Sequence, residues 1–539
     1  MNEVAIQQSL LEAIQKTSGE LDPQLAKQLL EPGFDMSLAD FGLDSLEAIQ
    51  CCMEIESLTG VELDPAELVT TDTFAALANL VADRLQGGTR RGTPQMVRAS
   101  RDAPLRLTYS QEAIWPYCQP PNIGYVLHIV DRITGPLDVA IFRDCLTQFV
   151  RRHEIARSTF ADADGEPRQI VHPSEPVSLP VFELKTTVEP NEQLIEIIEA
   201  EKVRVSDMSQ PPLIRFSLLR GSPDEHWLVV VCHHLIWDGW STDLFHDEIA
   251  LLYEAKHSGN EPPLPEEDWL QYADYATWQR EMLRHDGSAY RRIIGWWKQH
   301  FARELPWYDL PFSRATPSSA AKPDDGVIEL TVPSLLRSGV ESLQRSENIT
   351  FYNIWMASFV ALLSSMTGRS DVVVGTYAAN RNHAATQKMI GFLVNLIALR
   401  FHCKQSTSFA NWLREVKAAT AAAIPNGEIP IEQLLREGIA IPPIQAVFNA
   451  PLNLGRLGFS TANLNISKPH HRIQSQMPSG FEIVLLDQNA ALICRVSFDA
   501  TIYDPVTVRK FGNRLFDFIS RATQAPEKSL SQLLDEAVN

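Results

Sequence analysis

The sequence predicts a multidomain protein in which a small all-α four-helix bundle precedes a large α/β region of two lobes. Three observations predict this division. The chain has 539 residues, several times the length of a typical domain. Apolar residues follow a helical spacing up to residue 86, and helical and strand patterns alternate from residue 105 onward. Acidic residues are concentrated near the N-terminus, so the two parts also differ in composition.

The charge of the chain is unevenly distributed. Residues 1–84 contain 16 acidic and 3 basic residues and so carry −13 of the formal net charge of −20. Residues 87–104 reverse the sign, because arginines there lie among glycines and prolines, and this composition predicts a flexible basic linker. An acidic surface repels phosphate, so neither nucleic acid nor a membrane is an expected partner.

Residues 1–86 predict four helices. The first runs from Val4 to Lys16, and the second runs through LEAIQCCMEIES to Gly60. The DPAEL segment (64–68) predicts a short third helix, and Asp72 caps the last one. The apolar face of this last helix consists of Phe74, Leu77, Leu80, Val81 and Leu85.

A glycine-containing turn in this domain, DFGLDSL (40–46), places a serine at the start of the second helix. A phosphate esterified to Ser45 would lie at the positive end of that helix; alternatively, Asp44 or Ser45 only caps the helix. The turn, the size of the bundle and the acidic second helix resemble the acyl and peptidyl carrier proteins of fatty-acid, polyketide and nonribosomal peptide synthesis. The resemblance implies a 4′-phosphopantetheine cofactor, attached covalently to Ser45. The residues LDS (43–45) resemble acyl or aryl carriers more than peptidyl carriers, which leaves the loaded group open.

Residues 105–539 predict two α/β lobes, at about 105–280 and 281–539, with a cleft between them. The first lobe contains a predicted helix over 138–150 and a strand over Trp227–Cys232 that is apolar throughout, as in a strand buried on both faces. The second lobe repeats this make-up. Its expected strands and helices cover residues 327–332, 351–366, 372–376 and 393–401, with a final helix from Asp504.

The strongest motif follows the buried strand and reads HHLIWDGWS (233–241). It places His233 and His234 at a strand end, where α/β proteins commonly bind ligands, and Asp238 and Gly239 shortly after. Three interpretations are open. The histidines could be core residues held by hydrogen bonds, or metal ligands together with the aspartate, although no third well-spaced ligand follows. One histidine could instead act as a base or hydrogen-bonding group in catalysis.

This motif resembles the condensation domains of nonribosomal peptide synthetases, which have a chloramphenicol-acetyltransferase-like fold. Further segments match in the family's order: LTYSQEAIW (107–115), RRHEIARSTF (151–160), YADYATW (272–278), VVVGTYAANR (372–381), IGFLVNLIALR (390–400), NGEIPIEQLL (426–435) and QAVFNAPLN (445–453). The resemblance implies a carrier–condensation (thiolation–condensation) didomain. Such a protein condenses an acyl or aminoacyl thioester on its carrier arm with an acceptor amine, forming an amide bond.

The resemblance also implies roles for individual residues. His234 is expected at the reacting centre, with His233 structural beside it. Asp238 is expected to form a buried ion pair with Arg381, and Gly239 to let the backbone approach a substrate tunnel.

Two further residues, Asn395 and Trp240, are expected to support the tunnel. The sequence departs from the family at Asn380, where a glycine usually precedes the arginine. It also departs at Trp237, which is bulkier than the usual residue and is expected to fill the core. No metal is expected.

The resemblance implies several partners. A phosphopantetheinyl transferase attaches the arm. No adenylation domain follows in the sequence, so we expect an adenylating or acyl-loading enzyme to act in trans. The acceptor is expected on a downstream carrier protein or as a free small molecule.

Two other functions remain open, an epimerisation domain acting on the carrier-bound aminoacyl group and a non-catalytic docking module. The sequence has no EGHGRE-type motif, and the second histidine and the glycine of the HHLIWDGWS motif are both intact, which favours condensation. Seven cysteines without a CxxC pair, and the lack of an export or membrane segment, predict a cytoplasmic protein with reduced thiols.

Overall fold

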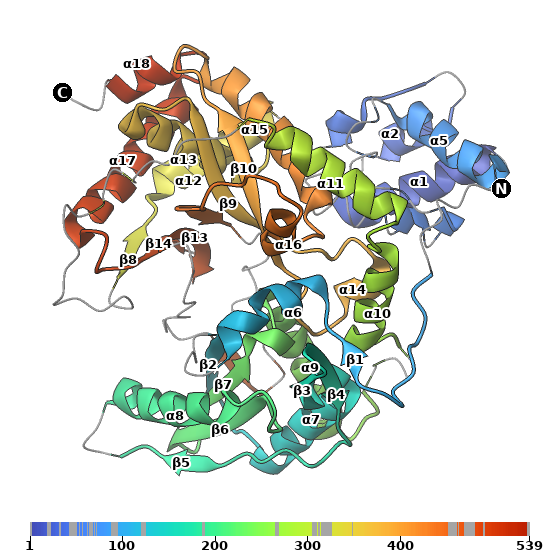
Figure 1. The fold of residues 1–539 in the computed structure, drawn as a ribbon, viewed down its shortest axis with the longest axis vertical. Coiled ribbons are helices and arrows are strands. Elements are labelled where there is room, and N and C mark those ends of the chain that lie inside the picture. Colours follow the sequence, from blue (N-terminus) through green and yellow to red (C-terminus); the bar gives the residue numbers. More distant parts are fainter. Residues whose placement is uncertain are drawn as a thin grey trace.

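The computed structural model describes residues 3–18, 23–31, 34–41, 51–52, 54–56, 58–61, 63, 68, 71, 73–87, 95–119, 125–185, 189–262, 264, 269–303, 310, 313, 326–347, 349–450, 461, 463–467, 480–488 and 491–535. Figure 1 shows a helical N-terminal part and two larger bodies, each with its own sheet. Each of the three parts also has its own hydrophobic core. The predicted fold class, a helical N-terminal part followed by an α/β region of two lobes, is confirmed.

The N-terminal domain is helical in the residues described. Its helices are α1 (Glu3–Ser18), α2 (Pro23–Gln28) and α5 (Phe74–Gly87), with a 3₁₀ turn at Leu38–Phe41. Helices α1 and α5 pack together around Leu10, Ile14, Leu77 and Val81.

The second helix of this domain is described only at its end. Gly60 has a φ of +71° and its N–H donates to the Glu56 carbonyl at 2.7 Å, so this helix ends at the glycine, as predicted. Residues 42–50 lie outside the described part of the chain, and the prediction on Ser45 is therefore not tested by the structure.

Part of the predicted linker is held against the first lobe. Residues 95–104 form no helix or strand, but they lie against the first lobe, and Met96 is buried in its core. The Arg101 guanidinium contacts both Glu154 and Asp274 at 2.8 Å, and the Ala99 N–H donates to Asp274 at 2.8 Å. Because Arg101 pairs with two buried carboxylates, this part of the linker is held in place.

The first lobe is built on a five-stranded sheet in the order β12-β2-β7-β6-β5. Its main strands are β2 (Val126–Thr134), β5 (Val181–Glu183), β6 (Ile214–Ser222) and β7 (Glu225–His233). Strands β2, β7 and β6 are antiparallel, whereas β5 runs parallel to β6. A smaller sheet is formed by β1 (Leu105–Arg106), β3 (Ser158–Ala163) and β4 (Glu166–Val171).

Strand β7 lies at the centre of the larger sheet, with helices on both of its faces. Val229 and Val231 pack on α8 (Pro190–Val205), whereas Leu228 and Val230 belong to the core formed with α7 (Val139–Arg152) and α9 (Gly239–His257). Burial on both faces explains the continuous apolar run predicted here. The strand carries the two histidines of the motif to the end of the sheet.

The second lobe has a six-stranded sheet in the order β10-β9-β11-β13-β14-β8. Its strands are β8 (Val327–Thr331), β9 (Asp371–Ala378), β10 (Asn395–His402), β11 (Val447–Asn449), β13 (Phe481–Gln488) and β14 (Ala491–Phe498). Strands β8, β9 and β10 lie where the sequence predicts them. Strands β11 and β13 pair in parallel, and β13, β14 and β8 are antiparallel neighbours.

Several helices pack on this second sheet. The central one, α13 (Phe351–Thr367), packs on β9 and is covered by α12 (Ser334–Glu347), α15 (Phe409–Ala423), α17 (Pro505–Gln524) and α18 (Leu530–Asp535). Helices α13 and α17 confirm the predicted helices over 351–366 and from Asp504, and Asp504 caps α17.

One strand crosses between the lobes, which the division at residue 280 does not anticipate. Strand β12 (Asn465–Ser467) comes from the C-terminal half of the chain but pairs with β2 of the first lobe. Gly135, at the end of β2, has a φ of +113°, and a Cβ there would lie 2.2 Å from the Asn463 carbonyl oxygen. The approach of this crossing strand therefore requires a glycine.

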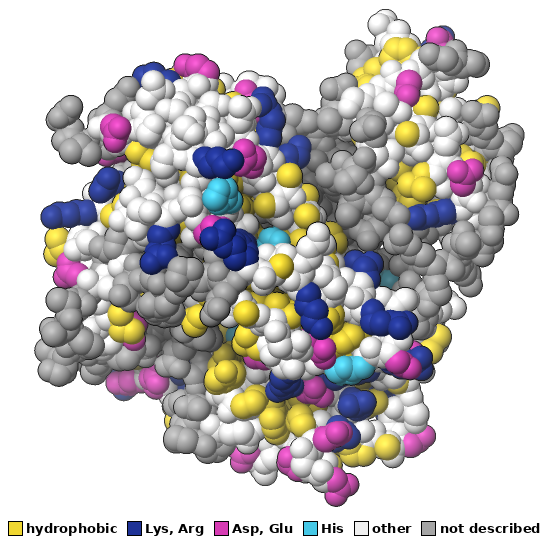
Figure 2. All heavy atoms as spheres, turned by 45° about the horizontal axis from the view of Figure 1, so that its top comes forward, with side chains coloured by type: hydrophobic (Ala, Val, Ile, Leu, Met, Phe, Trp, Pro, Cys, Tyr) yellow, Lys and Arg dark blue, Asp and Glu magenta, His cyan; other side chains and the backbone are white. Residues whose placement is uncertain are grey.

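Shorter helices lie around the two sheets. They are α6 (Tyr109–Ile114), α10 (Tyr272–Met282), α11 (Ser288–His300), α14 (Ala384–Gln387) and α16 (Ile431–Arg436). All seven cysteines are free and buried, as predicted. Acidic and basic side chains are interspersed over the described surface that Figure 2 shows.

Within the described ranges, no single helix is both long and apolar enough to cross a membrane. Helices α12 and α13 meet that requirement only as a pair bent by 107°, and α13 is buried in the second lobe.

Candidate active site

The two histidines of the HHLIWDGWS motif lie on either side of the end of β7. His233 is the last residue of the strand, and His234 begins a 3₁₀ turn (His234–Ile236) that leads to α9. The His234 N–H donates to the Tyr125 carbonyl at 2.7 Å. The change from strand to turn gives the two imidazoles different surroundings.

His233 is a buried, neutral residue. The Leu235 N–H donates to its Nδ1 at 3.1 Å, so this nitrogen carries no proton. The side chain is 2% exposed, and burial, with a smaller effect of the neighbouring His234, lowers its pKa to about 3. These contacts show His233 holding the 3₁₀ turn.

His234 has the opposite tautomer. Its Nδ1 lies 2.6 Å from the Trp237 carbonyl oxygen, which can only accept, so Nδ1 carries the proton and Nε2 is left with a lone pair. Burial lowers the pKa of His234, and the Trp237 carbonyl opposes that shift. The residue is nevertheless partly exposed, and Nε2 has no hydrogen-bond partner within the described ranges. The neutral ring can therefore accept a proton at Nε2.

Asp238 and Arg381 form the expected ion pair between the lobes. Arg381 Nη2 lies 3.0 Å from each carboxylate oxygen, and both side chains are almost fully buried. Asp238 also accepts from the Ser241 N–H at 2.8 Å, which caps α9, and from the Leu393 N–H at 3.2 Å. Both oxygens of this buried carboxylate are therefore occupied by donors, which leaves no free oxygen for chemistry.

The remaining contacts of Arg381 fix the segment that follows it. Its Nη1 donates to the carbonyls of Thr386 at 2.6 Å and Met389 at 2.7 Å. The guanidinium lies 5.4 Å from the centre of the Trp240 ring, and Trp240 Nε1 donates to the Gln387 carbonyl at 3.1 Å. We call these contacts the junction between the lobes: Asp238, Trp240 and Ser241 on the first lobe, and Arg381 with residues 386–393 on the second. Trp240 therefore supports this junction.

Three other expectations have different outcomes. Trp237 is fully buried beside Phe149 and Phe245, which confirms that it fills the core. Asn395 is buried and donates to the Gly427 carbonyl at 2.8 Å; its expected place at a tunnel stays a prediction. Gly239 is exposed, and no described atom lies within 4 Å of a Cβ at this position, so its role toward a substrate also stays a prediction.

The backbone conformation at position 380 explains why asparagine can stand where the family usually has glycine. Its φ is +53°, in the left-handed region that glycine tolerates best and that asparagine adopts more readily than most other residues. Its side-chain amide donates to the Leu393 carbonyl at 2.9 Å. Asparagine thus meets the backbone requirement of the position and adds one hydrogen bond.

Several residues around His234 were not singled out from the sequence. The Phe392 and His234 ring centroids are 4.8 Å apart in an edge-to-face arrangement, and the Tyr125 ring centroid is 6.4 Å from that of His234. The Tyr272 hydroxyl donates to the Phe392 carbonyl at 2.6 Å. Phe392 and Tyr272 belong to matched segments, but no sequence signal shows which of their residues meet at the histidine.

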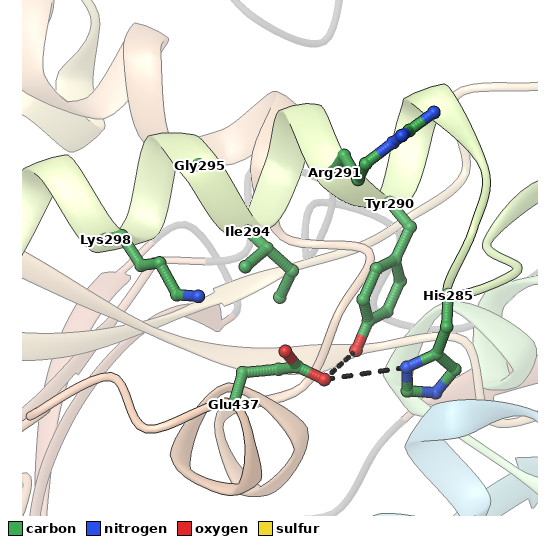
Figure 3. Close-up of a pocket in the computed structure, with 7 residues that line it drawn as sticks. All are labelled: His285, Tyr290, Arg291, Ile294, Gly295, Lys298 and Glu437. Carbon is green, nitrogen blue, oxygen red and sulfur yellow. Dashed lines mark hydrogen bonds and ion pairs between the residues drawn. The ribbon is translucent and has the colours of Figure 1, made fainter.

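No metal-binding cluster is found among the described residues, and a pocket is lined by residues outside the histidine motif. Among the described residues, no three His, Cys, Asp or Glu side chains come together in a way that could hold a metal ion. A pocket of about 300 Å³ lies between α11 and Glu437, just past the end of α16 (Figure 3). There the Tyr290 hydroxyl donates to Glu437 at 2.7 Å, and none of the lining residues belongs to the histidine motif.

Two protein families match this chain. Residues 104–537 match the condensation-domain family, and residues 23–81 match the phosphopantetheine attachment site family.

Curated relatives match most of the chain. It is 29% identical over 504 residues to a linear gramicidin synthase protein of Brevibacillus parabrevis, with 91% of this chain and 6% of that protein covered. It is 30% identical over 429 residues to the isonitrile lipopeptide synthase of Mycobacterium tuberculosis, with 78% of this chain and 17% of that protein covered. The chain therefore spans only a small part of these relatives.

Solved structures share the fold. The first condensation domain of the calcium-dependent antibiotic synthetase matches with a TM-score of 0.68 at 19% identity, covering 80% of this chain and 99% of that one. The X-domain from teicoplanin biosynthesis also matches with a TM-score of 0.68, at 22% identity, covering 81% of this chain and 99% of that one. The chain belongs to the condensation-domain family and carries a phosphopantetheine carrier domain ahead of it, as nonribosomal peptide synthetases do.

Proposed function

We propose that this chain forms an amide bond by transferring an acyl or aminoacyl group from a carrier thioester to an acceptor amine beside His234. The observation that carries the proposal is the state of the His234 ring. Its Nδ1 proton is held by the Trp237 carbonyl, so Nε2 remains an unprotonated base in a partly exposed position. The family matches on both domains support the same reaction.

The bond changes in this step balance. The amine nitrogen forms a bond to the thioester carbonyl carbon, and the carbon–sulfur bond breaks. His234 Nε2 accepts the proton that the amine loses and returns it to the departing sulfur, so the ring ends neutral. The lowered pKa of His234 keeps Nε2 available at neutral pH. Alignment of the two reactants supplies further acceleration, because an amine is already nucleophilic and a thiolate leaves readily.

Ser45 is the proposed attachment residue, since it supplies a hydroxyl within the matched segment 23–81. When attached, the arm presents the acyl group as a thioester. We propose that a phosphopantetheinyl transferase modifies Ser45 and that an adenylating or acyl-loading enzyme acts in trans. The acceptor is a downstream carrier protein or a free small molecule. The charge of −13 on residues 1–84 supports short-lived, salt-sensitive docking to these partners.

The experiment follows the mass of the intact protein. The full chain is converted to the holo form, loaded with an acyl group and incubated with a panel of amines. We expect the acyl mass to disappear from the carrier and an amide to form only when an amine is present. The Ser45→Ala variant should not load, and acyl loss that does not depend on any amine would overturn the proposal.

The same samples separate the two alternatives. Epimerisation would change the configuration of a loaded aminoacyl group without an acceptor, which chiral analysis of the released group detects. A docking module would leave the loaded group unchanged under all conditions. The seven buried thiols, free of disulfides, support a reducing cytoplasmic location for the reaction.

A further inference from the structure

Phe392 is a residue of the second lobe whose ring contacts the His234 ring. The phenyl and imidazole centroids are 4.8 Å apart and the ring planes meet at 70°, an edge-to-face arrangement. Phe392 is 7% exposed. His234 belongs to the first lobe, so this contact joins the candidate base to the opposite half of the molecule.

The backbone around Phe392 is fixed by side chains of the first lobe. The Gly391 N–H donates to Ser241 Oγ at 3.0 Å, and the Phe392 carbonyl accepts from the Tyr272 hydroxyl at 2.6 Å. The Leu393 N–H donates to Asp238 at 3.2 Å. Three consecutive residues are thus each bonded to a different residue across the junction.

Gly391 lets this segment come close enough to make those bonds. A Cβ at position 391 would lie 2.0 Å from Cδ2 of Tyr272, a distance that no packed side chain tolerates. The same tyrosine ring therefore limits the backbone from one side while its hydroxyl binds the next carbonyl. The position of the Phe392 ring is therefore set by the bonds of residues 391–393 to the first lobe as well as by the packing of the ring itself.

We propose that Phe392 is a positioning residue that holds the His234 imidazole with Nε2 facing the acceptor amine and keeps water from the ring face it covers. This role rests on the proposed function. It also gives the buried ion pair an influence on the chemistry. The Asp238 carboxylate, which pairs with Arg381, also binds the segment that carries Phe392.

Burial of the His234 ring affects its pKa more than the neighbouring ionisable groups do. Asp238 tends to raise the pKa of His234, but its charge is paired with Arg381. His233 is neutral, and the Tyr125 phenol has a pKa raised by burial. Burial is the largest cause of the lowered pKa of His234. Removing the Phe392 ring would admit water and move this pKa back toward its ordinary value.

The test uses the full holo chain and three variants. Phe392→Ala removes the ring, and Phe392→Leu keeps an apolar side chain of similar bulk. Phe409→Ala removes a fully buried phenyl from the second-lobe core, where it packs on Phe518 away from the site. Imidazole titrations are followed by NMR with labelled histidine. The His234 signal among the 14 histidines is identified by its absence in His234→Ala.

We expect Phe392→Ala to shift the His234 midpoint upward toward about 6.5 and to lower kcat by about 10- to 100-fold, with the KM for the amine little changed. Phe392→Leu should restore most of both values. Phe409→Ala should lower stability without moving the midpoint. If Phe392→Ala does not fold, Phe392→Val takes its place.

An unchanged His234 midpoint and rate in a folded Phe392→Ala or Phe392→Val variant would overturn the proposal, as would an equal shift in Phe409→Ala. Failure of the proposed function has a different signature. In that case the wild-type chain would make no amide from any amine, while the titration would still report on the contact between Phe392 and His234.

Discussion

The end of β7 and the junction that Asp238 and Arg381 form between the lobes differ in how completely their polar atoms are hydrogen-bonded. His234 keeps Nε2 without a hydrogen-bond partner in the described part of the chain. Asp238, by contrast, uses both carboxylate oxygens, bonding to Arg381, Ser241 and Leu393. This difference supports the proposal that the incompletely bonded group, His234, is the reactive one. The fully bonded group holds the two lobes together.

The neighbouring histidines sharpen that comparison. Both are neutral, but His233 accepts at Nδ1 and His234 donates from Nδ1. We expect His234→Ala to lower turnover by about 100- to 10,000-fold, the range lost with a general base, while the unfolding free energy changes little because the side chain is partly exposed. His233→Asn is the matched variant, since its amide oxygen can still accept from Leu235. It should keep turnover within a few-fold, and equal losses at both positions would contradict the division of roles.

We expect substitutions at the junction to lower the unfolding free energy rather than to act on a chemical step. Asp238→Ala leaves Arg381 charged and buried without its partner, which costs about 3–5 kcal/mol of unfolding free energy. Urea denaturation measures this loss. The control is Glu281→Ala, which breaks an exposed pair with Arg284 and should change stability by less than about 1 kcal/mol. Similar small changes in both variants would show that the buried pair does not hold the lobes.

His233 should make the protein sensitive to acid. Its pKa is about 3 in the folded state, below the ordinary value near 6.5, so the unfolded chain binds more protons at mildly acidic pH. Stability contributed by the neutral ring is present above pH 6.5 and is lost as the pH falls toward 3. Between pH 7 and 5 the loss amounts to about 2 kcal/mol. Denaturation of His233→Asn at the two pH values should show that much less pH dependence, and an identical slope to wild type would contradict the assignment.

The smallest expected effect lies at Asn380, where the backbone is left-handed. Asn380→Ala should lower stability by about 1–2 kcal/mol, because alanine is strained at a φ of +53° and the bond to the Leu393 carbonyl is lost. Asn380→Gly loses only the hydrogen bond and should cost less. Thermal unfolding of the two variants decides between these contributions, and a glycine variant less stable than the alanine variant would show that strain is unimportant.

Much of the fold could be predicted from the sequence because the elements have clear local signals. Strand β7 reads as apolar on both faces, and α7 and α17 begin at aspartates whose side chains accept from the first N–H groups. The crossing strand β12 could not be predicted, since three residues at an edge carry no periodic signal. The contacts of residues 95–104 with the first lobe could not be predicted either. Composition shows that Arg101 is charged, but not that the buried carboxylates of Glu154 and Asp274 lie beside it.

The candidate site divides in the same way. The histidine motif and the partner of Asp238 could be identified from residue type and order. The tautomers of the two histidines depend on backbone atoms of Leu235 and Trp237, which no residue pattern encodes. The contact between Phe392 and His234 joins positions far apart in the chain, so it exists only once both lobes have folded.

The most direct measurement delivers a reactive group to the site on the chain's own arm. Ser45 is loaded with a phosphopantetheine analogue that ends in a chloroacetyl group, and the alkylated residue is identified by digestion and mass spectrometry. We expect His234 to be alkylated at Nε2, with the adduct lost in His234→Ala and retained in His233→Asn. A fully loaded carrier that labels another residue, or none, would contradict the claim that acyl groups from Ser45 react beside His234.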